Sequence, residues 1–325
     1  MQFLPEYGLF LAKTLTFVAA MLVIMTGIAS IALKTKTKER LLVKKLNHKY
    51  QEMRQALQTI VLPKADLKKA LKQQKKADKA QPAADKRLYV LQFAGDLRAS
   101  EINSLRIAID AVLTLATARD EVVVRLESAG GMVHAYGLAA SQLDRIKRRG
   151  IPLTVCIDKI AASGGYLMAA VANRILAAPF AIIGSIGVVA QIPNFHRLLK
   201  KNNIDLELLT AGEYKRTLTL FGENTEKGRL KLQQEIEETH QIFKAFLSEH
   251  RPQLDIEKVA SGEHWLAMRA KDLHLVDDLI TSDDYLLNAS QTYDVIEVNH
   301  RIKRGLSERL SLAYHKACEA YTRYY

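Results

Sequence analysis

The chain has 325 residues and a formal net charge of +12, which first suggests nucleic acid or an anionic membrane as a partner. Residues 34–87 contain 14 Lys and 3 Arg against 2 Glu and 3 Asp, so this segment alone accounts for 17 − 5 = +12. A nucleic-acid enzyme would carry its basic residues on the folded domain, interleaved with aromatic side chains. We therefore predict no nucleic-acid partner.

The two cysteines, Cys156 and Cys318, are too few for a disulfide framework, and neither has the spacing of a metal site. Cys156 falls in the apolar run PLTVCI and is predicted to be an inert core residue. The stretch GSIG at 184–187 is not a P-loop, and no His and Glu pair has the spacing of a zinc peptidase. We predict no cofactor and no metal.

Residues 14–33 form a run of 20 uncharged residues between Lys13 and Lys34. A helix of that length spans about 30 Å, one bilayer crossing. The run predicts a single transmembrane helix within an N-terminal anchor over 1–33. A cleaved signal peptide is the competing interpretation, but its basic residues would precede the apolar run rather than follow it. The positive-inside tendency places the basic side in the cytoplasm.

Residues 34–86 are rich in Lys, Gln and Ala and contain stretches of helical spacing. Such a composition predicts a partly helical, solvated linker between the anchor and a folded domain. Basic tracts beside a membrane span are attracted to anionic headgroups. We therefore predict membrane lipid as a partner of this linker.

From Arg87 onward, apolar runs of strand length alternate with segments of helical periodicity, which is typical of βαβ units and a mostly parallel sheet. The predicted strands lie at 87–93, 120–128, 151–157 and 204–210. The predicted helices lie at 100–116 with Ser100 as the cap, 132–149 ending at Gly150, 164 onward, 194–203 and 225–249. The domain is predicted over 87–282, followed by a basic helical tail over 283–325.

Ser163 lies where a predicted strand turns into a helix that opens with Gly164 and Gly165. This arrangement is like that of a nucleophile elbow, in which the backbone N–H after the serine faces a developing oxyanion. The alternative interpretation is that Ser163 is only a small residue in a stretch where a helix packs closely. A second glycine pair, Gly130 and Gly131, also follows a buried strand, and in a parallel sheet both turns emerge at the same edge. The two turns together favour acyl chemistry.

A nucleophilic serine needs a base, and the nine histidines leave a Ser-His-Asp triad open. Among them, His134 lies near the second glycine turn. Lysine is the alternative base where burial disfavours its charged form. Lys215 follows the predicted strand 204–210 in a loop and is the candidate, although a lysine in such a place is ordinarily a solvated surface residue.

Four ordered motifs together resemble the signal peptide peptidase family, most closely its membrane-anchored SohB branch. They are ASGGY with Ser163, GSIGVVAQ with Ser185, GEYKRTLT with Lys215, and SGEHWLAMRAKDLHLVDDL near the end of the domain. The similarity runs from EYGLFLAKTLTFV near the start of the chain to Ile280. The resemblance implies a Ser-Lys protease on a ClpP/crotonase-like α/β fold.

Carried over by motif, the resemblance implies that Ser163 is the nucleophile and Lys215 the general base, with Ser185 orienting the lysine. The N–H groups of Gly131 and Gly164 would form the oxyanion hole. Many relatives read SPGG where this chain has SAGG over 128–131, so the turn loses its proline but keeps both glycines.

The resemblance also implies a homo-oligomer, because family members assemble as rings or domes in which neighbouring subunits can complete a dyad. The expected function is a membrane-anchored serine endopeptidase of the bacterial cytoplasmic membrane, acting on peptides such as signal peptides or misfolded membrane proteins. Relatives usually hold the catalytic domain outside the cytoplasm, whereas the basic segment favours the cytoplasmic side. A crotonase-like acyl-CoA enzyme and a non-catalytic membrane scaffold are the alternatives.

Overall fold

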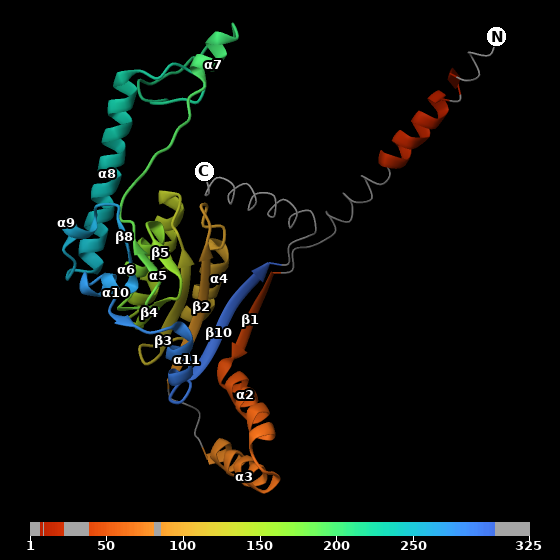
Figure 1. Ribbon diagram of the computed structural model, residues 1–325, viewed down its shortest axis with the longest axis vertical. Helices are drawn as coiled ribbons and strands as arrows, with labels where there is room; N and C mark the ends of the chain where they lie inside the picture. Colours follow the sequence, from red (N-terminus) through yellow and green to blue (C-terminus); the bar gives the residue numbers. More distant parts are fainter. Residues whose placement is uncertain (1–6, 9, 23–38, 81–85, 303–325) are drawn as a thin grey trace. The chain divides into compact units, whose positions relative to one another are not determined.

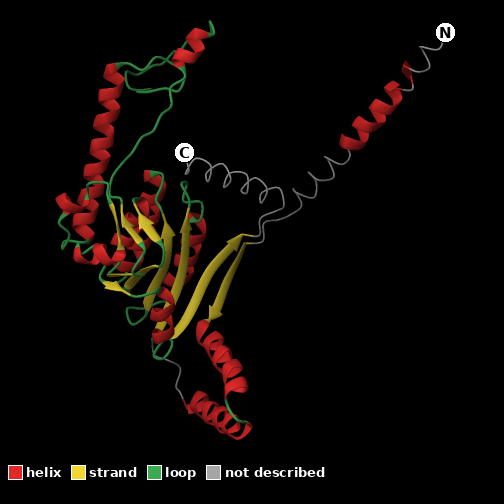
Figure 2. Cartoon of the chain, in the orientation of Figure 1, coloured by secondary structure: helices red, strands yellow, loops and turns green. Residues whose placement is uncertain are grey.

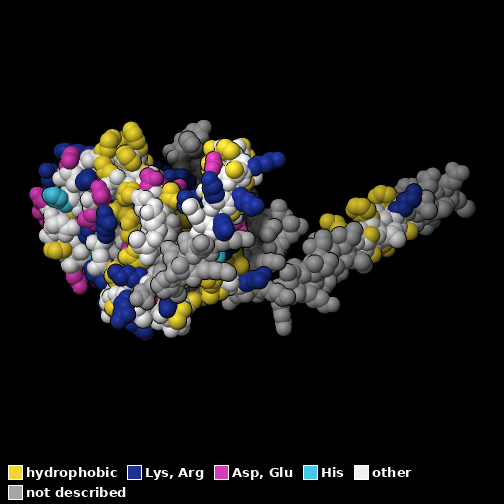
Figure 3. All heavy atoms as spheres, turned by 90° about the horizontal axis from the view of Figure 1, so that it is seen from below, with side chains coloured by type: hydrophobic (Ala, Val, Ile, Leu, Met, Phe, Trp, Pro, Cys, Tyr) yellow, Lys and Arg dark blue, Asp and Glu magenta, His cyan; other side chains and the backbone are white. Residues whose placement is uncertain are grey.

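The computed structural model describes residues 7–8, 10–22, 39–80 and 86–302. Residues 10–22 are helical, and apolar side chains are exposed on this helix (Figure 3). The rest of the predicted transmembrane helix, residues 23–33, lies outside the described residues. Within the described ranges, no helix combines the length and the apolar character that a bilayer crossing requires.

The chain divides into two compact units, Met1–Leu41 with His300–Tyr325, and Leu42–Asn299. The second unit includes most of the predicted linker, which is helical in α2 (Leu46–Val61) and α3 (Lys64–Ala80). The strand β1 (Glu39–Lys45) was not expected there. Leu46 is buried in an apolar cluster of the domain, so the linker is not solvated throughout as predicted.

One mixed sheet organises the domain (Figures 1 and 2), with strand order β1-β10-β2-β3-β4-β6-β9. Its strands are β2 (Arg87–Gly95), β3 (Glu121–Ser128), β4 (Leu153–Ile157), β6 (Arg174–Ala177), β9 (Asp278–Leu279) and β10 (Asp294–Ile302). A side branch contains β5 (Ile160–Ala162), β7 (Ile182–Gly184) and β8 (His264–Leu266). The pairings from β10 through β9 and from β3 through β7 are parallel, and β8 is antiparallel to β7. The predicted α/β fold with a mostly parallel sheet is confirmed.

The two faces of the sheet are covered by different helices. On one face, α4 (Ile102–Leu113), α5 (Val133–Arg148) and α6 (Gly164–Ala170) pack on alternate strand residues such as Val122 and Val124. On the other face, α11 (Ser282–Ala289) and the start of α2 pack on the intervening residues, among them Val123 and Cys156. Both faces are therefore apolar, as a sheet covered on two sides requires.

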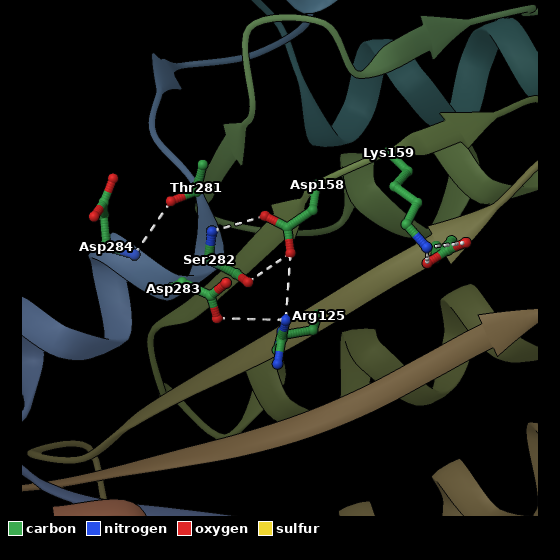
Figure 4. Close-up of polar contacts among 8 residues, drawn as sticks. Arg125, Asp158, Lys159, Thr281, Ser282, Asp283 and Asp284 are labelled. Atoms are coloured by element: carbon green, nitrogen blue, oxygen red, sulfur yellow. Dashed lines mark hydrogen bonds and ion pairs between the residues drawn. The ribbon is translucent and has the colours of Figure 1, made fainter. Parts of the chain in front are cut away.

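Asp158, just after β4, fastens α11 to the sheet (Figure 4). Its carboxylate accepts the Ser282 N–H at 2.8 Å and the Ser282 hydroxyl at 2.5 Å. Arg125 on β3 lies 3.5 Å from the same carboxylate and 3.6 Å from Asp283. Because Ser282 is fully buried, these bonds satisfy polar groups that would otherwise be costly to bury.

Cys156 is buried as predicted, and desolvation, aided by the negative charge of Asp158, raises the pKa of its thiol to about 12. Ser100 does not cap α4. Its hydroxyl and its N–H both donate to the Asp96 carboxylate, the N–H at 2.8 Å, so the side chain faces the preceding turn instead of the helix. Burial by itself would raise the Asp96 pKa, but these hydrogen bonds hold it below its ordinary value.

The predicted strand 204–210 is wrong, because these residues form an exposed irregular segment in the single chain. A strand needs a neighbour for its backbone ladder, and none of the strands that the structure describes pairs with this segment. The helices on either side of it are present as α7 (His196–Lys201) and α8 (Glu226–His250). The helices α9 (Ile256–Val259) and α10 (Ala267–Asp272) follow α8.

The predicted helical tail over 283–325 begins inside α11 and contains β10, which pairs with β2. A strand in this position belongs to the sheet rather than to a tail. Residues 303–325, where the amphipathic helix was predicted, lie outside the described residues.

Candidate active site

The ends of four adjacent parallel strands form one row at the carboxyl edge of the sheet. Gly95 of β2 pairs with Ser128 of β3, and Ser128 pairs with Ala161 of β5. The next position of β5, Ala162, pairs with Gly184 of β7. The loops that follow these four strands therefore begin at neighbouring points on one edge of the sheet. In parallel sheets, ligands bind at this edge.

Ser163 follows β5 directly and has φ 51° and ψ −121°. Few residues other than glycine adopt positive φ, because the side chain then crowds the backbone. The Ser163 N–H donates to the Gly184 carbonyl at 2.8 Å, and its own carbonyl accepts the Leu167 N–H at 2.9 Å. A strained serine between a strand and a helix has the geometry of a nucleophile elbow.

Ser185 lies immediately beyond the β5 and β7 pairing, beside the Ser163 turn. It also has φ 51°, and its N–H donates to the Glu263 carbonyl at 2.6 Å. Sequence analysis placed Ser185 in the site only through a family motif. In the structure, Ser185 lies beside the Ser163 turn because β7 is the strand next to β5.

The two glycine turns meet, as their positions after buried strands predict. Gly130 has φ 88°, and a Cβ atom there would lie 2.7 Å from the Gly164 nitrogen and 2.8 Å from the Ser163 Cβ. Gly164 opens α6, so its N–H has no acceptor within that helix. Next to Gly131, the Met132 N–H donates to the Leu97 carbonyl at 2.9 Å, which ties this turn to the loop after β2.

Lys215 is exposed, on the segment between α7 and α8. Its neighbours attach this segment to the first turns of α8, because Glu213 pairs with Lys227 and the Tyr214 ring lies under Lys231 at 5.6 Å. Figure 1 shows the segment at the end of α8 away from the sheet. The single chain therefore brings Ser163, Ser185 and the glycine turns together, but not Lys215.

Of the histidines weighed as an alternative base, His134 is exposed in the first turn of α5. His264, which sequence analysis did not single out, pairs with Gly184 across the β7 and β8 ladder. Its place became visible only with the antiparallel pairing of β8. Among the residues that the structure describes, no group of three or more His, Cys, Asp and Glu side chains is arranged to hold a metal ion.

Sequence reasoning missed two buried polar residues of the site, Ser128 and Tyr136. The Ser128 Oγ accepts the Gly130 N–H at 3.1 Å and lies 2.5 Å from the Tyr136 hydroxyl. Ser128 was visible in the sequence as the first residue of SAGG. Nothing in the local sequence distinguishes Tyr136 from an ordinary core residue of a helix.

Comparisons with known proteins agree over most of the chain. The family model described as "Peptidase family S49 N-terminal" matches residues 2–143, and "Peptidase family S49" matches residues 145–295. The "Probable protease SohB" of Haemophilus influenzae is 48% identical over 322 residues, which cover 94% of this chain and 91% of that protein. The "Probable protease SohB" of Buchnera aphidicola subsp. Schlechtendalia chinensis is 45% identical over 304 residues, covering 89% and 100%.

Among solved structures, a mutant of the "1510-N membrane-bound stomatin-specific protease" aligns with a TM-score of 0.42 at 14% identity, covering 63% of this chain and 84% of that chain. The ClpP protease catalytic domain from Plasmodium falciparum aligns with a TM-score of 0.37 at 13% identity, covering 60% and 86%.

Proposed function

Because the chain belongs to peptidase family S49, we propose that it is a serine endopeptidase in which Ser163 is the nucleophile and Lys215 the general base. The observation that carries the proposal is the backbone of Ser163. Its positive φ, at the start of α6 and against the Gly130 turn, is the kind of strain that persists where function requires it.

The N–H groups of Gly131 and Gly164 form the proposed oxyanion hole. Support comes from the close contact of the two glycine turns and from the position of Gly164 at the start of a helix. Backbone donors fixed in advance stabilise the charge that develops on a carbonyl oxygen during attack. The change from SPGG to SAGG leaves both of these donors in place.

Lys215 reaches Ser163 from a neighbouring subunit of a homo-oligomer in this proposal, with Ser185 orienting its amine. The exposure of Lys215 in the single chain supports this arrangement, because a solvated ammonium cannot act as a base. The surrounding segment is also unusually apolar for a free surface. Its exposed side chains include Leu206, Leu208, Leu209 and Phe221.

The reaction follows from these positions. Neutral Lys215 takes the hydroxyl proton of Ser163 as Oγ attacks the peptide carbonyl carbon, and the carbonyl oxygen moves into the oxyanion hole. The proton passes to the leaving amine, which releases the first product and leaves an ester on Ser163. Water, activated by Lys215, then hydrolyses that ester and releases the second product.

We further propose that the apolar N-terminal segment anchors the enzyme in the bacterial cytoplasmic membrane, where signal peptides and misfolded membrane proteins are candidate substrates. The apolar run over 14–33 supports the anchor. The ClpP/crotonase-like fold remains part of the proposal. Family membership favours a peptidase over the acyl-CoA alternative.

The test is active-site labelling of the detergent-solubilised full chain with a fluorophosphonate, alongside hydrolysis of a fluorogenic peptide. We expect the probe to label Ser163 and the Ser163→Ala and Lys215→Ala variants to lose at least about a hundredfold in kcat. Full turnover by Ser163→Ala would exclude Ser163 as the nucleophile, whereas a wild-type chain that neither reacts with the probe nor hydrolyses the peptide would favour the scaffold alternative. Activity of Lys215→Ala that disappears in His264→Ala would assign a histidine base instead.

A further inference from the structure

A single buried side chain, Tyr136 of α5, contacts both glycine turns of the site. It is completely shielded from solvent. Its ring lies against Gly164, where a Cβ atom would come within 2.5 Å of the Tyr136 Cγ. Its hydroxyl lies 2.5 Å from the Ser128 Oγ, at the base of the other turn.

The hydroxyl of Tyr136 belongs to a series of hydrogen bonds that connects the 128–131 turn to the residue after β2. It donates to the Asp96 carbonyl at 2.7 Å and lies 2.5 Å from the Ser128 Oγ. The Ser128 Oγ accepts the Gly130 N–H at 3.1 Å and lies 3.4 Å from the Gly95 carbonyl oxygen, to which its hydroxyl can donate. Successive bonds of this kind polarise and strengthen one another in a low-dielectric interior.

Residues of β2 leave space for the Tyr136 and Ser128 hydroxyls and fix the orientation of the Tyr136 ring. A Cβ atom on Gly95 would lie 2.5 Å from the Ser128 Oγ, so the end of β2 must be glycine for the two hydroxyls to fit. Phe93 meets the Tyr136 ring edge to face, with centroids 6.4 Å apart and an angle of 86°. The hydroxyl is therefore aimed by packing as well as by its hydrogen bonds.

We propose that Tyr136 is a positioning residue that sets the Gly131 and Gly164 donors at the spacing one carbonyl oxygen requires. This inference rests on the proposed function, since it assigns Tyr136 a role in the oxyanion hole of that reaction. Its ring supports the turn that begins α6, and its hydroxyl holds the 128–131 turn to the end of β2. Tyr136 touches no substrate and acts only through these two turns.

The test compares Tyr136→Phe with Tyr166→Phe in the full chain. Tyr166 is an equally buried tyrosine of α6 whose hydroxyl donates to the Leu275 carbonyl at 2.9 Å, so it is a matched control for the loss of a buried hydroxyl. We expect Tyr136→Phe to lower kcat by about ten- to a hundredfold with KM unchanged, because a displaced donor weakens transition-state binding. Tyr166→Phe should lower the thermal midpoint without lowering kcat.

A second variant keeps the inference testable if Tyr136→Phe does not fold. Ser128→Ala breaks the same hydrogen-bond chain and should reduce kcat by a similar factor, and the double variant should lose no more than the larger single loss. Wild-type kcat in Tyr136→Phe, or in Ser128→Ala, would overturn the inference. So would an equal kcat loss in Tyr166→Phe. Ser163→Ala tests the proposed function separately. An inactive Ser163→Ala together with a fully active Tyr136→Phe would support the peptidase and reject the positioning role of Tyr136.

Discussion

At the scale of single residues, the site stores strain in two serines. Ser163 and Ser185 both have φ 51°, a conformation that costs about 1–3 kcal/mol for a residue with a side chain. Backbone hydrogen bonds hold both in place, Ser163 to the Gly184 carbonyl and Ser185 to the Glu263 carbonyl. Neither conformation is required to continue a strand or a helix, so the strain fits a catalytic role better than a packing role.

The strained backbone of Ser163 therefore destabilises the folded domain, and glycine at this position should relieve the strain. We expect Ser163→Gly and Ser163→Ala both to be inactive, but Ser163→Gly to be more stable than Ser163→Ala by about 1 kcal/mol after the entropic cost of glycine. Thermal denaturation of the two variants measures the difference. A more stable Ser163→Ala would show that the Ser163 backbone is unstrained.

The sequence predicted the turn that contains Ser163, because an apolar strand and a glycine pair identify it locally. The positive φ of Ser163 and the contacts of Tyr136 could not be predicted in this way. The contacts of Tyr136 depend on Asp96 and Ser128, which lie 40 and 8 positions away and meet it only when β2, β3 and α5 have packed. The Ser163 backbone depends on the Gly184 carbonyl of β7, which accepts its N–H.

At the scale of elements, a buried ion pair fastens the end of α8 to the sheet. Arg251, only 3% exposed, makes two parallel bonds to the Asp277 carboxylate at 2.7 and 2.9 Å. Asp277 also accepts the Ile175 N–H of β6 at 2.6 Å, and Arg251 donates to the His274 carbonyl at 3.1 Å. The pair thus fixes the helix whose other end holds the Lys215 segment.

Removing one partner of this pair should cost far more than removing both. We expect Asp277→Ala to destabilise the domain by about 3–5 kcal/mol, because the Arg251 charge remains buried without its partner. The double variant Arg251→Met with Asp277→Leu should recover most of that loss. Thermal denaturation of the three proteins tests this, and equal losses in the single and double variants would contradict it.

The helices were predicted more accurately than the strands, and α8 shows why. Its 3.6-residue periodicity and its Thr225 cap, which accepts the Gly228 N–H, are local features. The segment 204–210 has the composition of a strand, but a strand also requires a partner from elsewhere. The sequence identifies residues 204–210 as strand-like but does not identify a second strand with which they would pair.

At the scale of the whole molecule, the single chain holds an incomplete version of the proposed site. Ser163 and its glycine turns are assembled, while Lys215 lies on an exposed segment with apolar side chains such as Leu209, which is 91% exposed. A subunit that offers this segment to a neighbour makes a heterologous contact, which closes into a ring when the rotation permits.

Mixed oligomers should therefore regain activity from two inactive variants. When Ser163→Ala and Lys215→Ala subunits are mixed before assembly, roughly a quarter of the sites combine an intact Ser163 with an intact Lys215 from the next subunit. We expect peptide hydrolysis at about that fraction of the wild-type rate. Co-assembled but inactive mixtures would place the dyad within one chain.

The pairing of β10 with β2 has a consequence for how the protein is made. The end of β2 and the start of β10 are 294 − 95 = 199 residues apart, which corresponds to about 10–40 s of translation. Throughout that interval the nascent chain presents an open strand edge, a form that invites aggregation or chaperone capture. Asp96, whose carbonyl accepts the Tyr136 hydroxyl proton beneath the glycine turns, is the residue directly after β2. Pairing with β10 therefore closes this edge only after every residue of the proposed site has been synthesised.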